Sequence, residues 1–304
     1  MKHKILHGFS DSASRVGPPV FETVHGVSPL GRWAYSIWRP RELQGQVDHL
    51  WAYDGPSSHR RKRVFPNGCV ELILNFGEAY RLVDGAGVDM CRTAWLSGPQ
   101  PGPILLEQPT HQHLIGVRLR PAGAHGVVGR PMRETTGLAL NLSDLVGPEA
   151  NDLLERCEEA RSIERRFRVV AQWITGCCAR APRMDAAVAW MVAQLDASGG
   201  TAPIAPLREH VGLSKMQLVE AFRRDVGLTP KLYARIVRFR QALFQLQSAR
   251  PRRLTDVALD AQYYDQAHMN TEFRALGGVT PRAFLARRHP VGDGSTVSEG
   301  TPAS

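Results

Sequence analysis

Two short stretches near the C-terminus carry similar hydrogen-bonding side chains at helical spacing. The first contains Gln217 and Glu220, and the second contains Gln266 and Asn270. A Gln side chain can pair with adenine, and a Glu side chain can accept a hydrogen bond from the N4 amine of cytosine. Side chains of these types, presented along one side of a helix, can therefore recognise the edges of nucleic-acid bases.

Each stretch has the sequence pattern of a short helix with one buried side. Ser214 and Asp265 are typical N-cap residues, and each is followed by apolar residues four and eight positions later. The apolar residues are Leu218, Phe222, Met269 and Phe273. A helix of this kind, placed after another short helix and a tight turn, is the reading element of a helix-turn-helix unit. Two such units in one basic segment indicate a protein that binds DNA.

Positive charge is concentrated in the same part of the chain. Residues 183–288 carry +7 of charge, whereas 1–182 carry +4 and 289–304 carry −2, which gives the net charge of +9. This excess suits a polyanion, although RNA or a membrane surface would also attract it. The densest basic run, 60–63, lies in the other half of the chain before a turn signal, and we interpret it as a solvated loop.

The first half of the chain has the pattern of β-strands separated by Gly and Pro turns. The expected strands are 32–38, 47–53, 69–76, 92–96, 104–107 and 113–119. Strands of this length predict an antiparallel sandwich or barrel, whose mouth can hold a small ligand. The fold class is therefore α+β, with an N-terminal β-barrel or sandwich followed by an all-α domain.

The pattern becomes helical from Pro148, which sets the expected domain boundaries. The expected parts of the chain are a β-rich sensor or dimerisation domain over 1–147, a helical linker over 148–182, a double helix-turn-helix domain over 183–288 and a disordered tail over 289–304. Ile236, Phe239, Leu243 and Leu246 form the apolar stripe of a long helix between the two units. The tail is rich in Gly, Ser and Thr, which is the basis for expecting disorder there.

Targeting signals and cysteine chemistry are not evident in the sequence. The N-terminus lacks the apolar run of a secretory signal, and no segment is long enough to cross a bilayer. The five cysteines show neither metal-ligand spacing nor an even disulfide framework. We therefore expect a cytoplasmic protein with reduced thiols and no membrane contact.

The C-terminal hundred residues resemble the DNA-binding domain of AraC/XylS-type transcription regulators. In that family, seven helices hold two helix-turn-helix units bridged by a long helix. The matching residues of the first half are Gly212, Leu213, Ser214, Leu218, Phe222, Gly227, Thr229, Pro230, Tyr233, Arg238 and Ala242. Those of the second half are Val257, Ala258, Tyr263, Asp265, His268, Phe273, Arg274, Thr280, Pro281 and Phe284. The resemblance implies double-stranded promoter DNA as partner and leaves contacts with RNA polymerase and a homodimer open.

The resemblance, combined with the helical wheel, gives the expected DNA contacts. In the first unit they are Lys215, Met216, Gln217, Val219, Glu220, Arg223 and Arg224, and in the second Gln266, Ala267, His268, Asn270, Thr271 and Arg274. Met216, Val219 and Glu220 would lie nearest the bases, where Met and Val can touch a thymine methyl. Arg223, Arg224, His268 and Arg274 would hold the backbone. For each polar residue the alternative is an ordinary solvated helix face.

Two positions depart from the usual helix-turn-helix pattern. Arg208 stands where a small residue is expected in the first helix, and Gln262 stands where the second turn usually has Gly. A non-Gly residue with a left-handed backbone costs about 1 kcal/mol relative to Gly, so we expect a distorted turn at Gln262. The stem of Arg208 must run along the helix interface with its head in solvent.

The N-terminal half resembles, less specifically, the cupin-like sensor domain of one subgroup of these regulators. The matching segments are 66–72, 97–99 and 118–123. The resemblance implies a small effector in the β domain, and the candidate lining residues are Trp33, Trp38, Trp51, Tyr53 and Arg118. Alternatively, these aromatic side chains are core residues and the β half only dimerises the regulator.

A metal-dependent enzyme is the competing hypothesis for the β half. His111 and His113 alternate on one strand and can face the same side, as metal ligands would. No carboxylate follows between Leu114 and Pro121, and no phosphate loop or nucleophile elbow occurs. We therefore expect no enzyme activity, no metal and no cofactor, and we interpret the chain as a one-component transcription regulator controlled by an effector.

Overall fold

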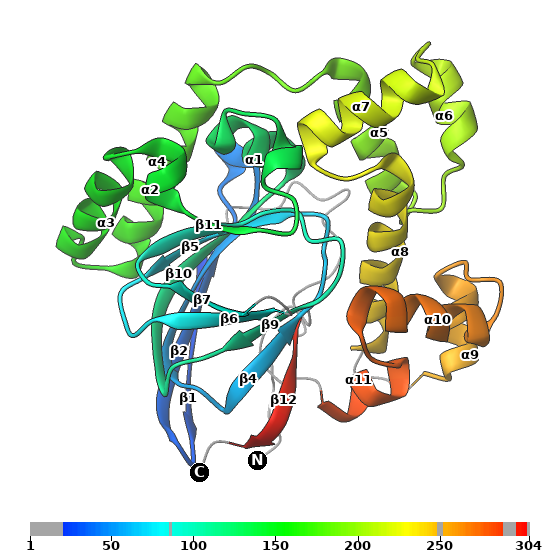
Figure 1. Ribbon diagram of the computed structural model, residues 1–304. Coiled ribbons are helices and arrows are strands. Elements are labelled where there is room, and N and C mark those ends of the chain that lie inside the picture. Colours follow the sequence, from blue (N-terminus) through cyan, green and yellow to red (C-terminus); the bar gives the residue numbers. More distant parts are fainter. Residues whose placement is uncertain (1–20, 85–86, 248–251, 288–295, 303–304) are drawn as a thin grey trace.

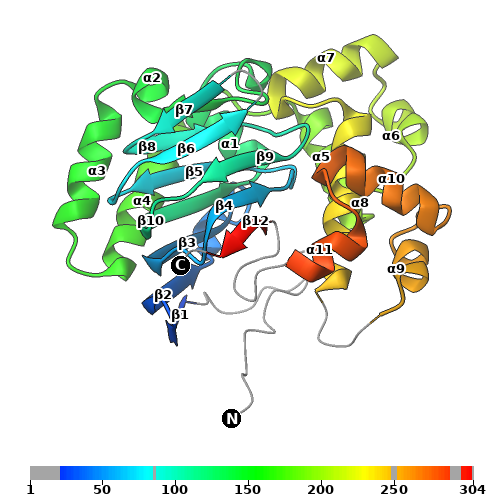
Figure 2. The ribbon, with the colours of Figure 1, turned by 60° about the horizontal axis from the view of Figure 1, so that its bottom comes forward.

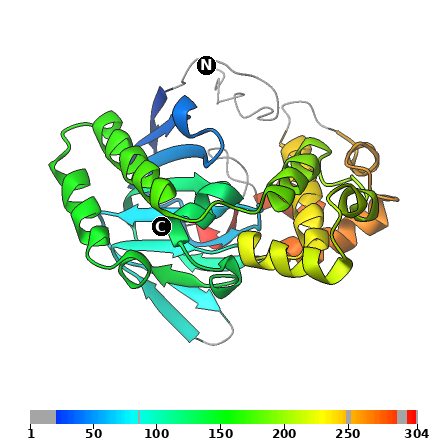
Figure 3. The ribbon, with the colours of Figure 1, turned by 90° about the horizontal axis from the view of Figure 1, so that it is seen from above.

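The computed structural model describes residues 21–84, 87–247, 252–287 and 296–302. A β half with its own helices lies beside a half made of helices α5 to α11 (Figure 1). The segment that joins the halves, after α4 (Ile163–Arg180) and before α5 (Ala186–Ala197), spans the top of the molecule (Figure 3). This arrangement confirms the predicted α+β fold with β structure first.

Two antiparallel sheets form the β half. The first has the strand order β1 (Phe21–Ser28), β2 (Gly31–Trp38), β3 (Val47–Pro56), β10 (His111–Leu119), β5 (Val70–Asn75), β8 (Ala94–Ser97) and β11 (Ala139–Asn141). The second has the order β12 (Thr296–Pro302), β4 (His59–Val64), β9 (Ile104–Glu107), β6 (Tyr80–Asp84) and β7 (Gly87–Cys91). Every predicted strand is present. The basic run expected in a solvated loop instead lies in β4, which pairs with β9.

Apolar side chains on the two faces of the large sheet pack into two separate cores. One core lies toward the small sheet and contains Ile73, Tyr80, Trp95 and Leu114, with Trp51 packed against it. The other core lies toward the helices that cover the large sheet on its far side (Figures 1 and 2). Those helices are α1 (Pro121–Val128), α2 (Leu142–Val146), α3 (Glu149–Glu159) and α4. Alternation along each strand sends successive side chains to opposite cores.

The segment expected as a helical linker is helical, but it belongs to the packing of the β half. Leu153 of α3 and Phe167 and Ile174 of α4 are fully buried in the same core as the strand residue Leu72. The apolar stripes of α3 and α4 need a partner surface, and the outer face of the large sheet provides it.

The expectation of a disordered tail is wrong for residues 296–302, which form β12 and pair antiparallel with β4. Thr296 pairs with Val64, and Glu299 pairs with Arg61. Without β12 the outer main-chain groups of β4 would form a free sheet edge. Pairing of this kind uses the main chain, so it leaves little apolar signal in the sequence. The remainder of the tail lies outside the described residues.

The second half packs around one long helix, α8 (Pro230–Leu246). The surrounding helices are α5, α6 (Ile204–His210), α7 (Lys215–Val226), α9 (Leu254–Asp260), α10 (Gln266–Gly277) and α11 (Pro281–Arg287). The predicted stripe of α8 is buried as expected, with Ile236 and Phe239 0% exposed. Thr229 caps α8 by accepting a hydrogen bond from the amide of Leu232.

Candidate nucleic-acid interface

The first helix-turn-helix unit consists of α6 and α7. Gly212 in the turn has φ 69°, a left-handed conformation that Gly adopts without steric cost. Ser214 and Gln217 form a capping box: the Ser214 hydroxyl accepts from the Gln217 amide at 3.3 Å, and the Gln217 side chain accepts from the Ser214 amide at 3.0 Å. Leu218 and Phe222 are buried, as predicted.

The second unit consists of α9 and α10 and has the same order of short helix, turn and capped helix. The Asp265 carboxylate accepts from the His268 amide at 2.7 Å, and Met269 and Phe273 are 0% exposed. Gln262 has φ 54°, the only positive φ of a non-Gly residue among the described residues. The second turn therefore adopts the left-handed conformation of the first turn at the energetic cost expected for Gln.

Arg208 has 31% of its side chain exposed, and its Nη2 donates to Glu209 at 3.4 Å. Its Nε is buried without a hydrogen-bond partner in the described part of the chain. Arg208 and Gln262 depart from the usual pattern, yet both helix-turn-helix units form.

Most of the side chains predicted to contact DNA are exposed on the outward sides of α7 and α10. The exposed ones are Lys215, Met216, Gln217, Glu220, Arg223, Arg224, Ala267, His268, Thr271 and Arg274. Val219, Gln266 and Asn270 are half-buried. Met216 is 82% exposed, which is unusual for an apolar side chain of its size.

Two of the exposed residues of α7 already have charged partners. Arg224 donates to the buried Asp225 at 2.6 Å, and its guanidinium lies 3.8 Å from the carboxylate of Asp185. Glu220 accepts from Arg133 at 2.9 Å. Arg133 belongs to the 3-10 turn η2 (Met132–Glu134) of the β half. The centre of the outward side of α7 therefore contacts the β half.

The C-terminal end of α7 is closely packed against the same region of the β half. The Thr136 hydroxyl donates to the Gly227 carbonyl at 2.7 Å. A Cβ atom at Gly227 would lie 2.8 Å from the Thr136 hydroxyl and 2.9 Å from Pro99, and φ there is 83°. Only Gly fits this position, so α7 ends in direct contact with the β half.

A turn after β4 inserts into the helical half. Phe65 is 2% exposed and belongs to the helical core, with ring centroids 5.8 Å from Phe239 of α8 and 6.0 Å from Phe284 of α11. The Asn67 carbonyl accepts from the Arg240 guanidinium at 2.9 Å. The sequence indicated a turn at this place but not its contact with α8 and α11.

The predicted effector-lining residues do not all face the same side of the large sheet. Strand register pairs Tyr53 with Leu114 and Trp51 with Gly116, so these side chains share the face toward the small sheet. Arg118, two residues further along β10, shares that face. Trp38 lies on the other face, where its ring stacks on Phe167 of α4.

The end of the barrel interior near Arg118 contains charged groups. Arg118 donates to Glu71 at 2.6 Å, and Arg120 donates to Asp48 at 2.7 Å. Burial alone would raise the pKa of Asp48, but the hydrogen bond with His49 and the charges of His49, Arg120 and Arg118 hold that pKa well below its usual value. Glu71 also accepts from the Asn67 side chain at 3.3 Å, so these charges are connected to the turn that contacts α8.

The two histidines considered as metal ligands have other partners. His111 contacts Asp54 at 2.9 Å, and His113 contacts the Arg166 guanidinium at 3.0 Å. The described residues contain no group of three or more His, Cys, Asp or Glu side chains arranged to hold a metal ion. None of the five cysteines forms a disulfide bond, and burial raises the pKa of Cys157 and Cys177 to about 11.

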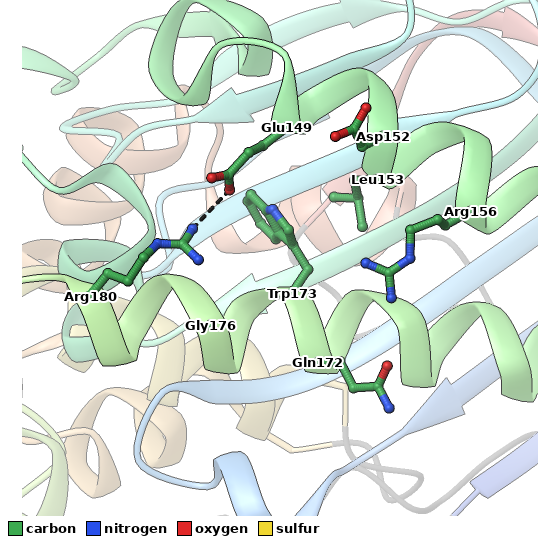
Figure 4. A pocket seen from close by; sticks show the side chains of 8 residues that line it. All are labelled: Glu149, Asp152, Leu153, Arg156, Gln172, Trp173, Gly176 and Arg180. Atoms are coloured by element: carbon green, nitrogen blue, oxygen red, sulfur yellow. Dashed lines mark hydrogen bonds and ion pairs between the residues drawn. The ribbon is translucent and has the colours of Figure 1, made fainter.

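A cavity of about 280 Å³ lies between α3 and α4 (Figure 4). The indole of Trp173 points toward α3, and Arg180 forms an ion pair with Glu149 at 2.8 Å across the cavity. The indole Nε1 is buried without a hydrogen-bond partner in the described structure. None of the residues predicted to bind the effector lines this cavity. No helix of the described residues is long and apolar enough to cross a membrane.

Two family models match the sequence. A model described as a domain of unknown function matches residues 39–141, and a model described as a helix-turn-helix domain matches residues 207–287. No curated protein matches the chain.

The solved structures that match this one include ToxT from Vibrio cholerae, at 9% identity and a TM-score of 0.48, over 78% of this chain and 98% of ToxT. A structure of ToxT bound to an unsaturated fatty acid matches at 11% identity and a TM-score of 0.46, over 77% of this chain and 93% of that one. The AraC-like transcriptional activator CuxR matches at 14% identity and a TM-score of 0.24, over 67% and 74% of the two chains.

The matched helix-turn-helix region covers both units and the long helix between them. Its capped reading helices, α7 and α10, and the bridging helix α8 agree with the arrangement that the sequence resemblance implied. Residues 207–287 are therefore a helix-turn-helix domain with two units, the kind of domain that binds DNA.

Proposed function

We propose that the chain is a one-component, cytoplasmic regulator that reads promoter DNA with α7 and α10. The observation that carries the proposal is the pair of capped helices with exposed polar sides in a segment of charge +7. The bridging helix α8 would place the two reading helices about 34 Å apart, so that one protomer meets two successive major-groove segments. Contact with RNA polymerase and formation of a homodimer are further parts of this proposal.

Recognition would depend on the outward residues of the two reading helices. Met216, Val219 and Glu220 of α7 would approach the bases, and Gln266 and Asn270 of α10 would do so in the second unit. Glu220 is suited to accept from cytosine N4, provided that it releases Arg133. Arg223 is exposed, whereas Arg224 is paired with the buried Asp225, which favours Arg223 as the phosphate contact of this turn.

We also propose that a small effector bound in the β half controls DNA binding. The barrel interior offers Trp33, Trp51 and Tyr53 as aromatic walls and Arg118 as a charged group. Support for control comes from the direct contacts between the halves, since Arg133 holds Glu220 and Phe65 lies in the helical core. A β half with these functions needs no metal, cofactor or catalytic activity.

The test is a genome-wide pull-down of bound DNA followed by binding measurements on the best site across a salt series. We expect enrichment at a few promoters and a steep fall in affinity as salt rises. A Glu220→Ala variant should change the preferred base in a binding-site selection without unfolding the domain. Diffuse enrichment, or an unchanged base preference in the variant, would contradict the proposal.

A further inference from the structure

A second cavity, of about 520 Å³, lies at the junction of the two helix-turn-helix units. Three elements form its walls: the segment 200–204 that leads into α6, the first half of α8, and the first half of α10. The cavity therefore belongs to neither unit alone. Its ionisable lining residues are Lys231, Arg235, Arg238, His268 and Glu272.

Positive charge exceeds negative charge in this cavity. Arg235 donates twice to Glu272, at 2.9 Å each, so this pair is neutral overall. Lys231 is exposed and has no ion-pair or hydrogen-bond partner among the described residues. His268 is also exposed. The cavity thus keeps an unneutralised ammonium group and an ionisable imidazole at its surface.

Buried polar groups without partners occur in the lining residue Arg238 and in Tyr263, which lies behind it. Arg238 donates to the Gly200 carbonyl at 3.0 Å, but its Nε is buried without an acceptor in the described structure. The Arg238 guanidinium lies 5.9 Å from the centre of the Tyr263 ring. The Tyr263 side chain is 3% exposed, and its hydroxyl is also without a partner in the described residues. Buried donors usually have partners, so these groups indicate a place where an anion or water belongs.

The cavity adjoins the predicted reading surface. On the helical wheel of α10, His268 lies between Thr271 on the outward side and Glu272 in the cavity. A duplex held by both reading helices must run from the outward side of α10 toward α7. Between two major-groove segments on one face of B-DNA lies a minor groove, bordered by the phosphates of both strands. The backbone would thus pass over the junction of the units.

We propose that this junction cavity binds a phosphodiester group of the DNA backbone, with Lys231, Arg238 and His268 as the anion-binding side chains. Lys231 supplies a mobile ammonium group at the entrance, and Arg238 supplies a guanidinium fixed by Gly200 and Tyr263. The site fixes the spacing of the two units on the duplex and carries no base specificity. The inference rests on the proposed DNA-binding function and adds to it two residues outside both reading helices, Lys231 and Arg238.

The experiment compares Lys231→Gln with Arg168→Gln, which removes one exposed positive charge from α4 in the β half. Log affinity for the best duplex is measured against log salt concentration. Lys231→Gln is expected to reduce the steepness of the salt dependence by about 0.9, with base preference unchanged, whereas Arg168→Gln changes neither. His268→Gln, a second exposed position, should act in the same direction.

The position of the phosphate is tested with duplexes that carry a neutral methylphosphonate in the central minor-groove segment. The modification should weaken binding by the native chain and have little effect on Lys231→Gln, because the two changes remove the same contact. The inference would be overturned if the methylphosphonate weakened binding equally in the native protein and in Lys231→Gln, so that the two losses add. An unchanged salt dependence in Lys231→Gln would also overturn it. Either result would leave sequence-specific DNA binding intact. The native protein could instead bind DNA without sequence preference while Lys231→Gln still reduces the salt dependence of binding. That result would overturn the proposed function and retain the phosphate site.

Titration of the free protein with inorganic phosphate separates the two sources of the anion. Inorganic phosphate could stabilise the native protein but not Lys231→Gln, while the methylphosphonate has no effect on DNA binding. That combination would assign the cavity to a free phosphate and overturn the DNA assignment. The expected result is a strong effect of the methylphosphonate and a weak effect of free phosphate.

Discussion

Replacement of Phe65 by Ala tests how firmly the β half holds the helical half. Phe65 is 2% exposed, and its ring packs against Phe239 and Phe284. Truncation of a buried Phe to Ala typically costs about 3–5 kcal/mol through lost burial and the cavity left behind. The other contacts between the halves are weaker. The Arg133–Glu220 pair is exposed and stabilises by about 0–1 kcal/mol, and the Arg240–Asn67 hydrogen bond by about 1.5–3 kcal/mol.

Phe65 is therefore the largest single contribution to this interface, and Phe65→Ala should allow the halves to separate before either unfolds. Calorimetry is expected to show two thermal transitions in the variant, and hydrogen exchange should become faster in α8 and α11. Leu72→Ala is the matched control, because Leu72 is 0% exposed in the core of the β half and does not touch α8. Leu72→Ala should destabilise the β half. At temperatures where the β half remains folded, hydrogen exchange in α11 should be no faster than in the native protein. Unchanged exchange in α8 and α11 of Phe65→Ala would refute the argument.

Three further changes have calculable effects. Arg133→Ala should raise DNA affinity up to about fivefold, since DNA no longer has to displace Arg133 from Glu220; equal or lower affinity in a titration would contradict this. Gln262→Gly should stabilise the domain by about 0.5–1 kcal/mol in urea unfolding, because φ is 54° there, and no gain would mean that the turn is unstrained. Asp48→Asn should destabilise the protein at pH 7. The folded-state pKa of Asp48 lies below its unfolded value near 4, so the difference from native protein should shrink as the pH falls below about 4; urea unfolding at pH 7, 5 and 3 measures this.

The elements of the reading helices were predictable because their signals are local. Ser214 and Asp265 cap α7 and α10, and the apolar residues four and eight positions later are buried. Strand alternation was equally informative where successive side chains enter the two cores on either face of the large sheet, as in β3 and β10. It failed for β4 and β12, which are joined through main-chain hydrogen bonds that basic or small side chains do not reveal.

Contacts between distant segments were not predictable from the sequence. Phe65 was recognised as part of a turn, but its place in the helical core depends on packing against Phe239 of α8 and Phe284 of α11, which lie 174 and 219 residues later. Trp38 was placed among effector residues for its residue type, yet strand register turns it toward α4. The basic residues of the junction cavity were also missed, because Lys231, Arg235 and Arg238 lie outside both predicted reading helices.

Helix α8 connects the contact with the β half to the proposed phosphate site. At about 100° per residue, Lys231, Arg235 and Arg238 fall within about 60° of one another, and Arg240 lies about 180° from Lys231. One side of α8 thus lines the junction cavity, while the opposite side receives the carbonyl of Asn67. The Asn67 side chain in turn contacts Glu71, the partner of Arg118 in the barrel. We therefore expect a ligand that takes Arg118 away from Glu71 to alter the turn that supports α8, and we expect α8 to pass that change to both reading helices.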